Sequence, residues 1–211
     1  MNYSHERSEP KWKTYNGPLP TLPAPAWWLG DLARDYLFER ELNPKVAGVN
    51  GWYPADMDVP RMVIPCINSA GTVYWQARAM DGRTKLRYDS PTAPRGDSIV
   101  AVHPLGYYKS QAVIVEGPMD ALAAAEFGYL GIALMGKNPA AEALELIVTR
   151  FGRTHVPFLI IPDKDDEGFG ATLVAAFANL GATAAVRLLT HGKDLCEMTK
   201  LQREKFLQQK G

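Results

Sequence analysis

The sequence is poor in cysteine, and its two thiols stand alone. Cys66 and Cys196 lie far apart in the chain and belong to no CxxC motif or cluster of cysteine and histidine. A structural zinc site needs four such ligands at short spacings, so this chain is not expected to bind zinc. We interpret both cysteines as small residues of the core.

Neither sign of charge is in excess, and no long apolar run is present. Lysine and arginine number 23, as do aspartate and glutamate, so the chain lacks the overall basic character of a nucleic-acid binder. Any such binding must use a local patch. No stretch approaches the ~20 apolar residues that span a bilayer, and the N-terminus lacks the apolar run of a signal peptide. With 46% hydrophobic residues over 211 positions, the chain is predicted to be a folded cytoplasmic protein without membrane contact.

The first thirty positions have a composition of their own. Residues 1–30 are polar and then rich in proline (GPLPTLPAPAWW). This composition favours extended polyproline II structure, so we expect a flexible arm. Trp27 and Trp28 at its end either dock the arm on the body of the protein or contact a nucleobase or a protein partner. We favour docking.

Residues 31–110 are predicted to form a small α+β part. Residues 31–43 carry apolar side chains at helical spacing. Residues 61–67 and 72–79 read as strands and flank NSAG, a turn sequence, which predicts a β-hairpin. A third short strand is expected near residues 85–88.

From residue 111 onward, short apolar strands alternate with helices. The strand-like runs are AVIVE, YLGIALM, PFLIIPD and ATAAVRLLT, and the helical runs between them are MDALAAAEFG, AAEALELIVTRFG and ATLVAAFANLG. Such alternation is typical of a parallel sheet covered by helices on both faces. We therefore predict an α/β domain over residues 111–199, followed by a polar helix or tail at 200–211.

Acidic residues follow two of these strands. Glu116 ends AVIVE, while Asp163 and Asp165 follow LIIP within DKDDEG. Functional groups gather beyond the carboxyl ends of strands in an open parallel sheet, so the three carboxylates are expected to meet there. Clustered carboxylates repel one another unless a cation neutralises them, and Mg²⁺ or Mn²⁺ suits oxygen ligands. The alternative is that these are ordinary loop acids, which are common in turns; their joint occurrence at strand ends favours a metal site.

The two acidic motifs resemble those of a known family. VEGPMDAL at 115–122 and IIPDKDDEG at 160–168 are similar to the glutamate and DxD motifs of the TOPRIM domain, which DnaG-type primases, topoisomerases and some nucleases share. The resemblance implies catalytic and metal-binding roles for the three acids named above. It also implies supporting roles for three residues of the same motifs, namely Gly117, Asp120 and Gly168.

Further segments resemble primases in particular. GKDLCEM is similar to an acidic segment downstream of the primase TOPRIM motifs and adds Asp194 as an implied metal ligand. YLFEREL, RMVIPCINSAGTVYWQAR and RYDSP resemble segments of the primase RNA polymerase core upstream. In that core, basic residues of the small part face the metal site and hold template and nucleotide. The positions to which this role carries over are Arg61, Arg78, Lys85 and Arg87.

Three other residues have two interpretations each. Lys137, in the loop after IALM, is either a phosphate contact or a solvated lysine. Trp75 and Tyr88 either fill the core of the small part or stack on bases, and we favour the core.

The resemblance implies a DNA primase core that makes short RNA primers on single-stranded DNA from nucleoside triphosphates, by Mg²⁺-dependent nucleotidyl transfer. No counterpart of the zinc-binding or helicase-binding module of a bacterial primase is seen, so a separate zinc-containing protein and a replicative helicase are expected partners. A phage or plasmid replication system in a bacterial cell is the expected setting. The alternatives are a TOPRIM nuclease and a catalytically degenerate module that binds single strands or a helicase. A topoisomerase is disfavoured because no segment matches its tyrosine-bearing domain.

Overall fold

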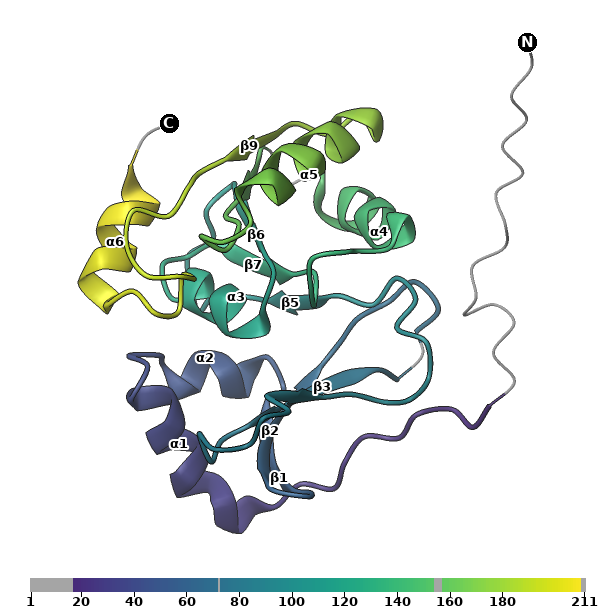
Figure 1. The fold of residues 1–211 in the computed structure, drawn as a ribbon, viewed down its shortest axis with the longest axis vertical. Coiled ribbons are helices and arrows are strands. Elements are labelled where there is room, and N and C mark those ends of the chain that lie inside the picture. The colour runs from purple at the N-terminus through teal and green to yellow at the C-terminus, as the bar shows by residue number, and fades with distance from the viewer. Residues whose placement is uncertain (1–16, 72, 154–156, 210–211) are drawn as a thin grey trace.

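The computed structural model describes residues 17–71, 73–153 and 157–209, which form two parts stacked on each other (Figure 1). Residues 1–16 of the predicted arm lie outside the described residues. The smaller part contains, in chain order, η2 (Trp27–Leu29), α1 (Gly30–Phe38), α2 (Pro44–Val49), β1 (Tyr53–Asp56), β2 (Pro60–Pro65), β3 (Trp75–Ala79) and β4 (Tyr88–Asp89).

The small sheet is antiparallel, in the order β1-β2-β3-β4. The predicted hairpin is confirmed, because β2 pairs with β3 in a register that sets Arg61 opposite Ala79. The sequence analysis missed β1 and α2. Strand β1 contains Pro54, which weakens a strand pattern. Helix α2 is only six residues long, and its main signal is the Asn43 side chain that caps it.

The larger part holds a five-stranded sheet in the order β5-β7-β6-β8-β9. Its elements are β5 (Val100–Val102), β6 (Ala112–Val115), α3 (Pro118–Ala125), β7 (Leu130–Ala133), α4 (Ala141–Phe151), β8 (Phe158–Ile160), α5 (Glu167–Asn179), β9 (Ala184–Val186) and, after the sheet, α6 (Lys200–Gln208). The pairs among β7, β6, β8 and β9 are parallel, and β5 lies antiparallel on β7. The predicted fold class is therefore confirmed: an α/β sheet flanked by helices, preceded by a small α+β part.

Helices cover both faces of the large sheet (Figure 1). Helices α4 and α5 pack on one face, while α3 lies on the face turned toward the small part. Every residue of α3 is buried, and the helix can approach β7 closely because Gly131 has no side chain. A Cβ atom at Gly131 would lie 2.0 Å from the carbonyl oxygen of Ala121. No helix among the described residues has both the length and the apolar character needed to cross a lipid bilayer.

One hydrophobic core joins the two parts. It includes Leu37 and Val46 of the small part together with Val115 and Leu122 of the large part. Strand β5 precedes residue 111, so the large sheet takes one strand from the segment assigned to the small part. The domain bounds at residues 30 and 110 remain a proposal. Because this core is continuous, we expect the two parts to keep a fixed position relative to each other.

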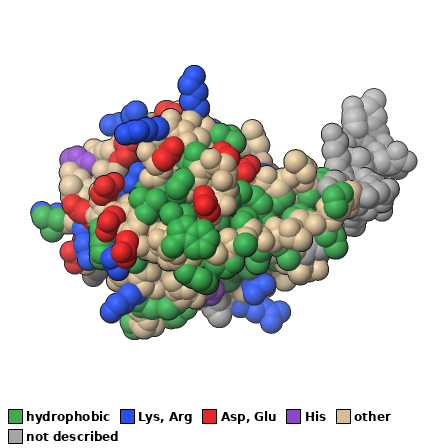
Figure 2. All heavy atoms as spheres, turned by 90° about the horizontal axis from the view of Figure 1, so that it is seen from below, with side chains coloured by type: hydrophobic (Ala, Val, Ile, Leu, Met, Phe, Trp, Pro, Cys, Tyr) green, Lys and Arg blue, Asp and Glu red, His purple; other side chains and the backbone are tan. Residues whose placement is uncertain are grey.

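The described end of the arm is held mainly by its backbone. The Trp75 indole donates to the Thr21 carbonyl (2.9 Å), and the Ala26 N–H donates to the Pro54 carbonyl (2.8 Å). The indoles contribute little to this docking: Trp27 is 70% and Trp28 74% exposed, although Trp27 lies against the ring of Tyr53. Seen from below, the molecule shows hydrophobic side chains near its middle and charged ones mainly toward one side (Figure 2).

Candidate active site in the cleft between the two parts

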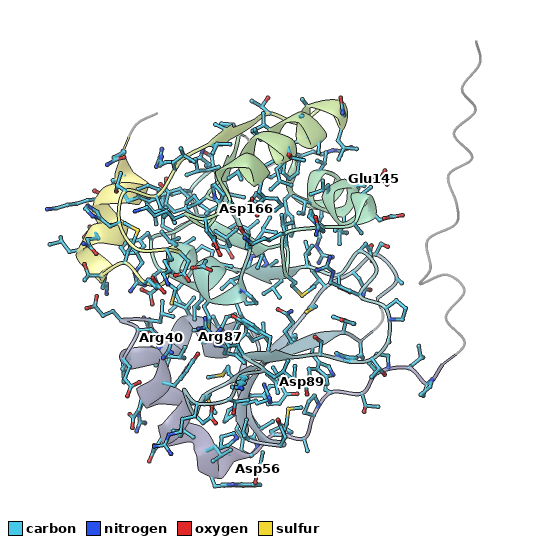
Figure 3. All side chains as sticks on the ribbon, viewed as in Figure 1. Arg40, Asp56, Arg87, Asp89, Glu145 and Asp166 are labelled. Atoms are coloured by element: carbon cyan, nitrogen blue, oxygen red, sulfur yellow. The ribbon has the colours of Figure 1, made fainter. Side chains whose placement is uncertain are left out.

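A cleft of about 900 Å³ lies between the two parts. One wall comes from the large part and carries five acids: the exposed Glu197, and four that are at least partly buried, Glu116, Asp120, Asp163 and Asp194. The other comes from the small part and carries the arginines Arg40, Arg78 and Arg87 together with the acids Glu39, Glu41 and Asp81. Figure 3 shows Arg40 and Arg87 on the side of the small part that faces the large part, with Asp166 beyond them in the large part. The cleft thus sets an acidic wall opposite a wall that carries both arginines and acids.

Glu116 and Asp163 meet as predicted, because they follow neighbouring parallel strands. Strands β6 and β8 are paired with Ile114 opposite Ile160, so their carboxyl ends lie side by side. The backbone N–H of Asp163 donates to the Glu116 carboxylate at 3.3 Å. Glu116 is buried and Asp163 half-buried. These two acids form the centre of the acidic wall.

Asp165 lies apart from the cleft. Its side chain is 80% exposed and forms an ion pair with Lys137 (3.6 Å), which also pairs with Asp166 (3.3 Å). The chain turns between Asp163 and Asp166, whose N–H donates to the Asp163 carbonyl, so residues two apart point in different directions. Among the described residues, no three Asp, Glu, His or Cys side chains form a ready-made set of metal ligands.

Asp120 and Asp194 form a second acidic pair on the same wall. Asp120 is buried in the first turn of α3 and accepts a hydrogen bond from the Cys196 N–H at 2.8 Å. Asp194 accepts one from the Glu197 N–H at 2.7 Å. The first bond holds the loop before α6 against α3, and the second closes a turn within that loop. Asp120, given only a supporting role from the sequence, therefore lies as deep in the cleft as the predicted catalytic acids.

The pKa values of Glu116, Asp120, Asp163 and Asp194 are all raised, in each case first by burial. Burial, reinforced by the charges of Glu116, Asp194 and Asp165, raises the pKa of Asp163 to about 7. Burial likewise raises the pKa of Glu116. The pKa of Asp120 is raised well above its ordinary range by burial and by Asp194, whose own pKa is also raised by burial. A bound divalent cation would offset this repulsion, and the all-oxygen donor set suits Mg²⁺.

The arginines of the small part are held by aromatic rings. The Arg78 Nε donates to the Tyr36 hydroxyl at 2.8 Å, and its guanidinium lies 4.8 Å from the centre of the Tyr88 ring. Arg40 stacks over the Tyr36 ring at 3.8 Å. Such stacking orients a guanidinium without neutralising it, so both remain able to bind anions. The sequence analysis missed Arg40, although YLFEREL was recognised as a primase-like segment.

Three of the predicted phosphate contacts, Arg61, Lys85 and Lys137, do not line the cleft. Arg61 is fully buried: its guanidinium pairs with Asp58 through two hydrogen bonds of 2.7 and 2.9 Å and donates to the carbonyls of Ala77 and Leu86. The structure thus gives Arg61 a structural role instead of the predicted phosphate contact. Lys85 is exposed but does not line the cleft.

The remaining predicted residues have clear positions. Trp75 is buried in the core of the small part, as favoured, whereas Tyr88 is partly buried and also lines the cleft. Gly117 caps α3, and a Cβ there would lie 3.0 Å from the Asp120 carboxylate, which explains the need for a small residue. Gly168 lies in the first turn of α5 with open space around its Cβ position, so packing does not require glycine there.

Comparisons with known proteins agree with this architecture. Residues 113–199 match the model of the Toprim-like family. The fold is similar to a crystal structure of the Aquifex aeolicus primase that contains its zinc-binding and RNA polymerase domains, with a TM-score of 0.67 and 17% identity. The match covers 86% of this chain and 55% of that one, so the present chain spans about half the length of the primase structure. No curated protein matches the sequence. Residues 113–199 thus match the Toprim-like family, within a chain whose fold is similar to that of the primase structure.

Proposed function

We propose that this chain is the catalytic core of a DNA primase, which synthesises short RNA primers on single-stranded DNA. The observation that carries the proposal is the cleft, in which buried acids face stacked arginines. Toprim-like domains generally bind divalent metal ions, and a nucleoside triphosphate needs both a metal ion and cationic groups for its phosphates. A cleft of about 900 Å³ suits a nucleotide on a template strand.

The proposed metal ligands are Glu116, Asp163, Asp165 and Asp194. Asp165 pairs with Lys137 in this structure and would have to turn away from it to join the other three. When bound, Mg²⁺ supplies a Lewis acid that polarises phosphate oxygens. The pKa values of Asp163 and Asp194, which burial raises, support the assignment, because a bound cation would stabilise the ionised form of both carboxylates.

The proposed reaction joins two nucleotides. The 3′-hydroxyl oxygen of one attacks the α-phosphorus of the next, a bond forms between them, and the bond from the α-phosphorus to the bridging oxygen breaks to release pyrophosphate. Glu116 is buried beside Asp163 and is placed to accept the hydroxyl proton. Arg78 and Arg87 hold phosphate oxygens from the opposite wall, which aligns the reacting groups.

Single-stranded DNA and nucleoside triphosphates are the proposed partners of the cleft. A replicative helicase and a separate zinc-containing protein are proposed as further partners in start-site selection, in a phage or plasmid replication system. The described arm presents the exposed Trp27 and Trp28, which offer aromatic faces to a protein or a nucleobase.

The test is primer synthesis by the purified chain with single-stranded DNA, labelled ribonucleotides and Mg²⁺. The variant with both Asp163→Ala and Asp165→Ala should make no labelled product. Asp56→Ala is the matched control, because Asp56 is an exposed acid on β1 far from the cleft (Figure 3). Primer synthesis by the wild type and by the Asp56→Ala control, but not by the double variant, supports the proposal. Strand cleavage without synthesis would instead identify a nuclease, and binding of single strands without either reaction would identify a degenerate binding module.

A further inference from the structure

A buried arginine on α6 joins the two walls of the cleft. Arg203 is fully buried, and its Nε donates to the Met198 carbonyl at 3.0 Å. Its Nη2 donates to the carbonyls of Arg40 (2.7 Å) and Glu41 (3.2 Å). Met198 belongs to the acidic wall of the large part, while Arg40 and Glu41 belong to the wall of the small part. One guanidinium therefore bonds to both walls at once.

A second contact reinforces the same junction. The Glu41 carboxylate accepts a hydrogen bond from the Lys200 backbone N–H in the first turn of α6. Glu41 has a φ of 52°, a left-handed conformation that is costly for a residue other than glycine. Such a conformation persists only where its surroundings hold it, which indicates that these contacts are strong enough to constrain the turn.

The charge of Arg203 is only partly compensated. Its Nη1 lies 3.9 Å from the Glu126 carboxylate, within ion-pair range but too far for a hydrogen bond. Glu126 in turn accepts a hydrogen bond from the Asn43 N–H, just after the turn that Arg203 holds. A buried ion pair of this kind adds little net stability, so its main effect is to define geometry.

The junction is connected to the functional side chains on each wall. On the acidic side, the loop that Arg203 holds carries Asp194, and its Cys196 N–H donates to Asp120. On the side of the small part, Arg40 stacks on Tyr36, which accepts the hydrogen bond from Arg78. A shift at Arg203 would therefore move acids and arginines relative to each other.

We propose that Arg203 is a positioning residue that fixes the separation of the acidic wall of the large part from the arginine-bearing wall of the small part, so that both walls contact one nucleoside triphosphate. This inference rests on the proposed function and names a residue outside the segment matched by the Toprim-like family, residues 113–199. Arg203 touches no substrate itself. It acts through Arg40 and the loop that bears Asp194.

Two variants remove contacts of the junction between the two walls and are expected to keep the fold stable; we call them the release variants. Glu41→Gly removes the carboxylate that binds the Lys200 N–H and relieves the left-handed strain, so it should keep or raise stability. Arg203→Met with Glu126→Gln removes both buried charges and keeps an acceptor for the Asn43 N–H. Lys205→Met is the matched control, because Lys205 is exposed on the same helix.

The first measurement is amide hydrogen exchange in the metal-free protein without substrate. Both release variants should speed exchange at residues 194–199 and 39–43 by about tenfold or more, while α4 and α5 keep their protection. The second is primer synthesis, in which the KM for ribonucleotides should rise about tenfold and kcat change by less than about threefold. A purely structural role would lower the amount of active protein, and hence kcat, without raising KM.

Unchanged exchange in both variants would overturn the inference, as would faster exchange with an unchanged KM. If the wild type makes no primers, the proposed function fails, and the exchange result still decides whether Arg203 holds the walls. The inference is supported if both release variants show faster exchange and a raised KM, and if Lys205→Met shows neither effect.

Discussion

The titration of Asp163 makes the stability of this protein depend on pH near neutrality. Its pKa is about 7 in the folded chain, against about 4 for an aspartate in an unfolded chain. A carboxyl group with a raised pKa favours folding while it is protonated, so this contribution is lost as pH rises from about 4 to about 7. The metal-free protein should therefore become less stable over this window through Asp163.

A divalent cation should reverse that loss, because it binds the ionised carboxylate. We predict that Mg²⁺ raises the melting temperature more at pH 8 than at pH 5, since protons compete with the metal at the lower pH. Thermal melts with and without Mg²⁺ at both pH values test this, with Asp163→Asn as comparison. An equal Mg²⁺ effect at the two pH values, or an undiminished effect in Asp163→Asn, would contradict the assignment.

Lys137 is the cation nearest to the acids. It pairs with Asp165 and Asp166, and its charge also lowers the pKa of Glu116. Removing it should tighten Mg²⁺ binding by about two- to fivefold, the range expected of an exposed ion pair, and weaken binding of a triphosphate. Calorimetric titration of Lys137→Met with Mg²⁺ tests the first effect, and Lys45→Met serves as the control. Weaker Mg²⁺ binding would show that Lys137 supports the metal site instead of competing with it.

At the scale of elements, the close contact between α3 and β7 positions Asp120. Gly131→Ala places a Cβ 2.0 Å from the Ala121 carbonyl, so helix and strand must separate. We expect a loss of about 3 kcal/mol or more in the free energy of unfolding. Gly48→Ala, in α2 with open space at its Cβ, should instead stabilise the fold by about 0.5–1 kcal/mol. Denaturant unfolding measures both, and a loss of less than about 1 kcal/mol in Gly131→Ala would refute the packing argument.

The elements also show how far the sequence could predict the site. The meeting of Glu116 and Asp163 followed from a rule of topology, because neighbouring parallel strands end at the same edge. Asp165 was expected to project beside Asp163, whereas in this structure a turn closed by the Asp166 N–H sends it toward Lys137. Arg61 was expected at a phosphate, whereas β2 sets its guanidinium inside the small part, where Asp58 and two carbonyls bind it. Side-chain direction in short strands and turns depends on contacts that local patterns do not contain.

At the scale of the whole molecule, the proposed function requires the chain to bind an anion without a net positive charge. Its charges are balanced at 23 of each sign, so the proposed binding of DNA would gain little from long-range attraction and would depend on the arginines that line the cleft. Each arginine that contacts a phosphate should then contribute to the salt dependence of binding, whereas an arginine that holds the fold should not.

Arg61 and Arg87 separate these two cases. Arg87 is exposed and lines the cleft, so Arg87→Gln should weaken binding of single-stranded DNA, reduce the slope of log affinity against log salt by about 0.7, and leave the melting temperature unchanged. Arg61→Gln should lower the melting temperature by about 5 °C or more, since it leaves buried carbonyls without donors. For Arg61→Gln, the slope of log affinity against log salt should equal that of the wild type. Fluorescence titrations at several salt concentrations, paired with thermal melts, measure both quantities. A reduced slope in Arg61→Gln would mean that the small part opens to expose this arginine to DNA, and an unchanged slope in Arg87→Gln would place the DNA path away from the cleft.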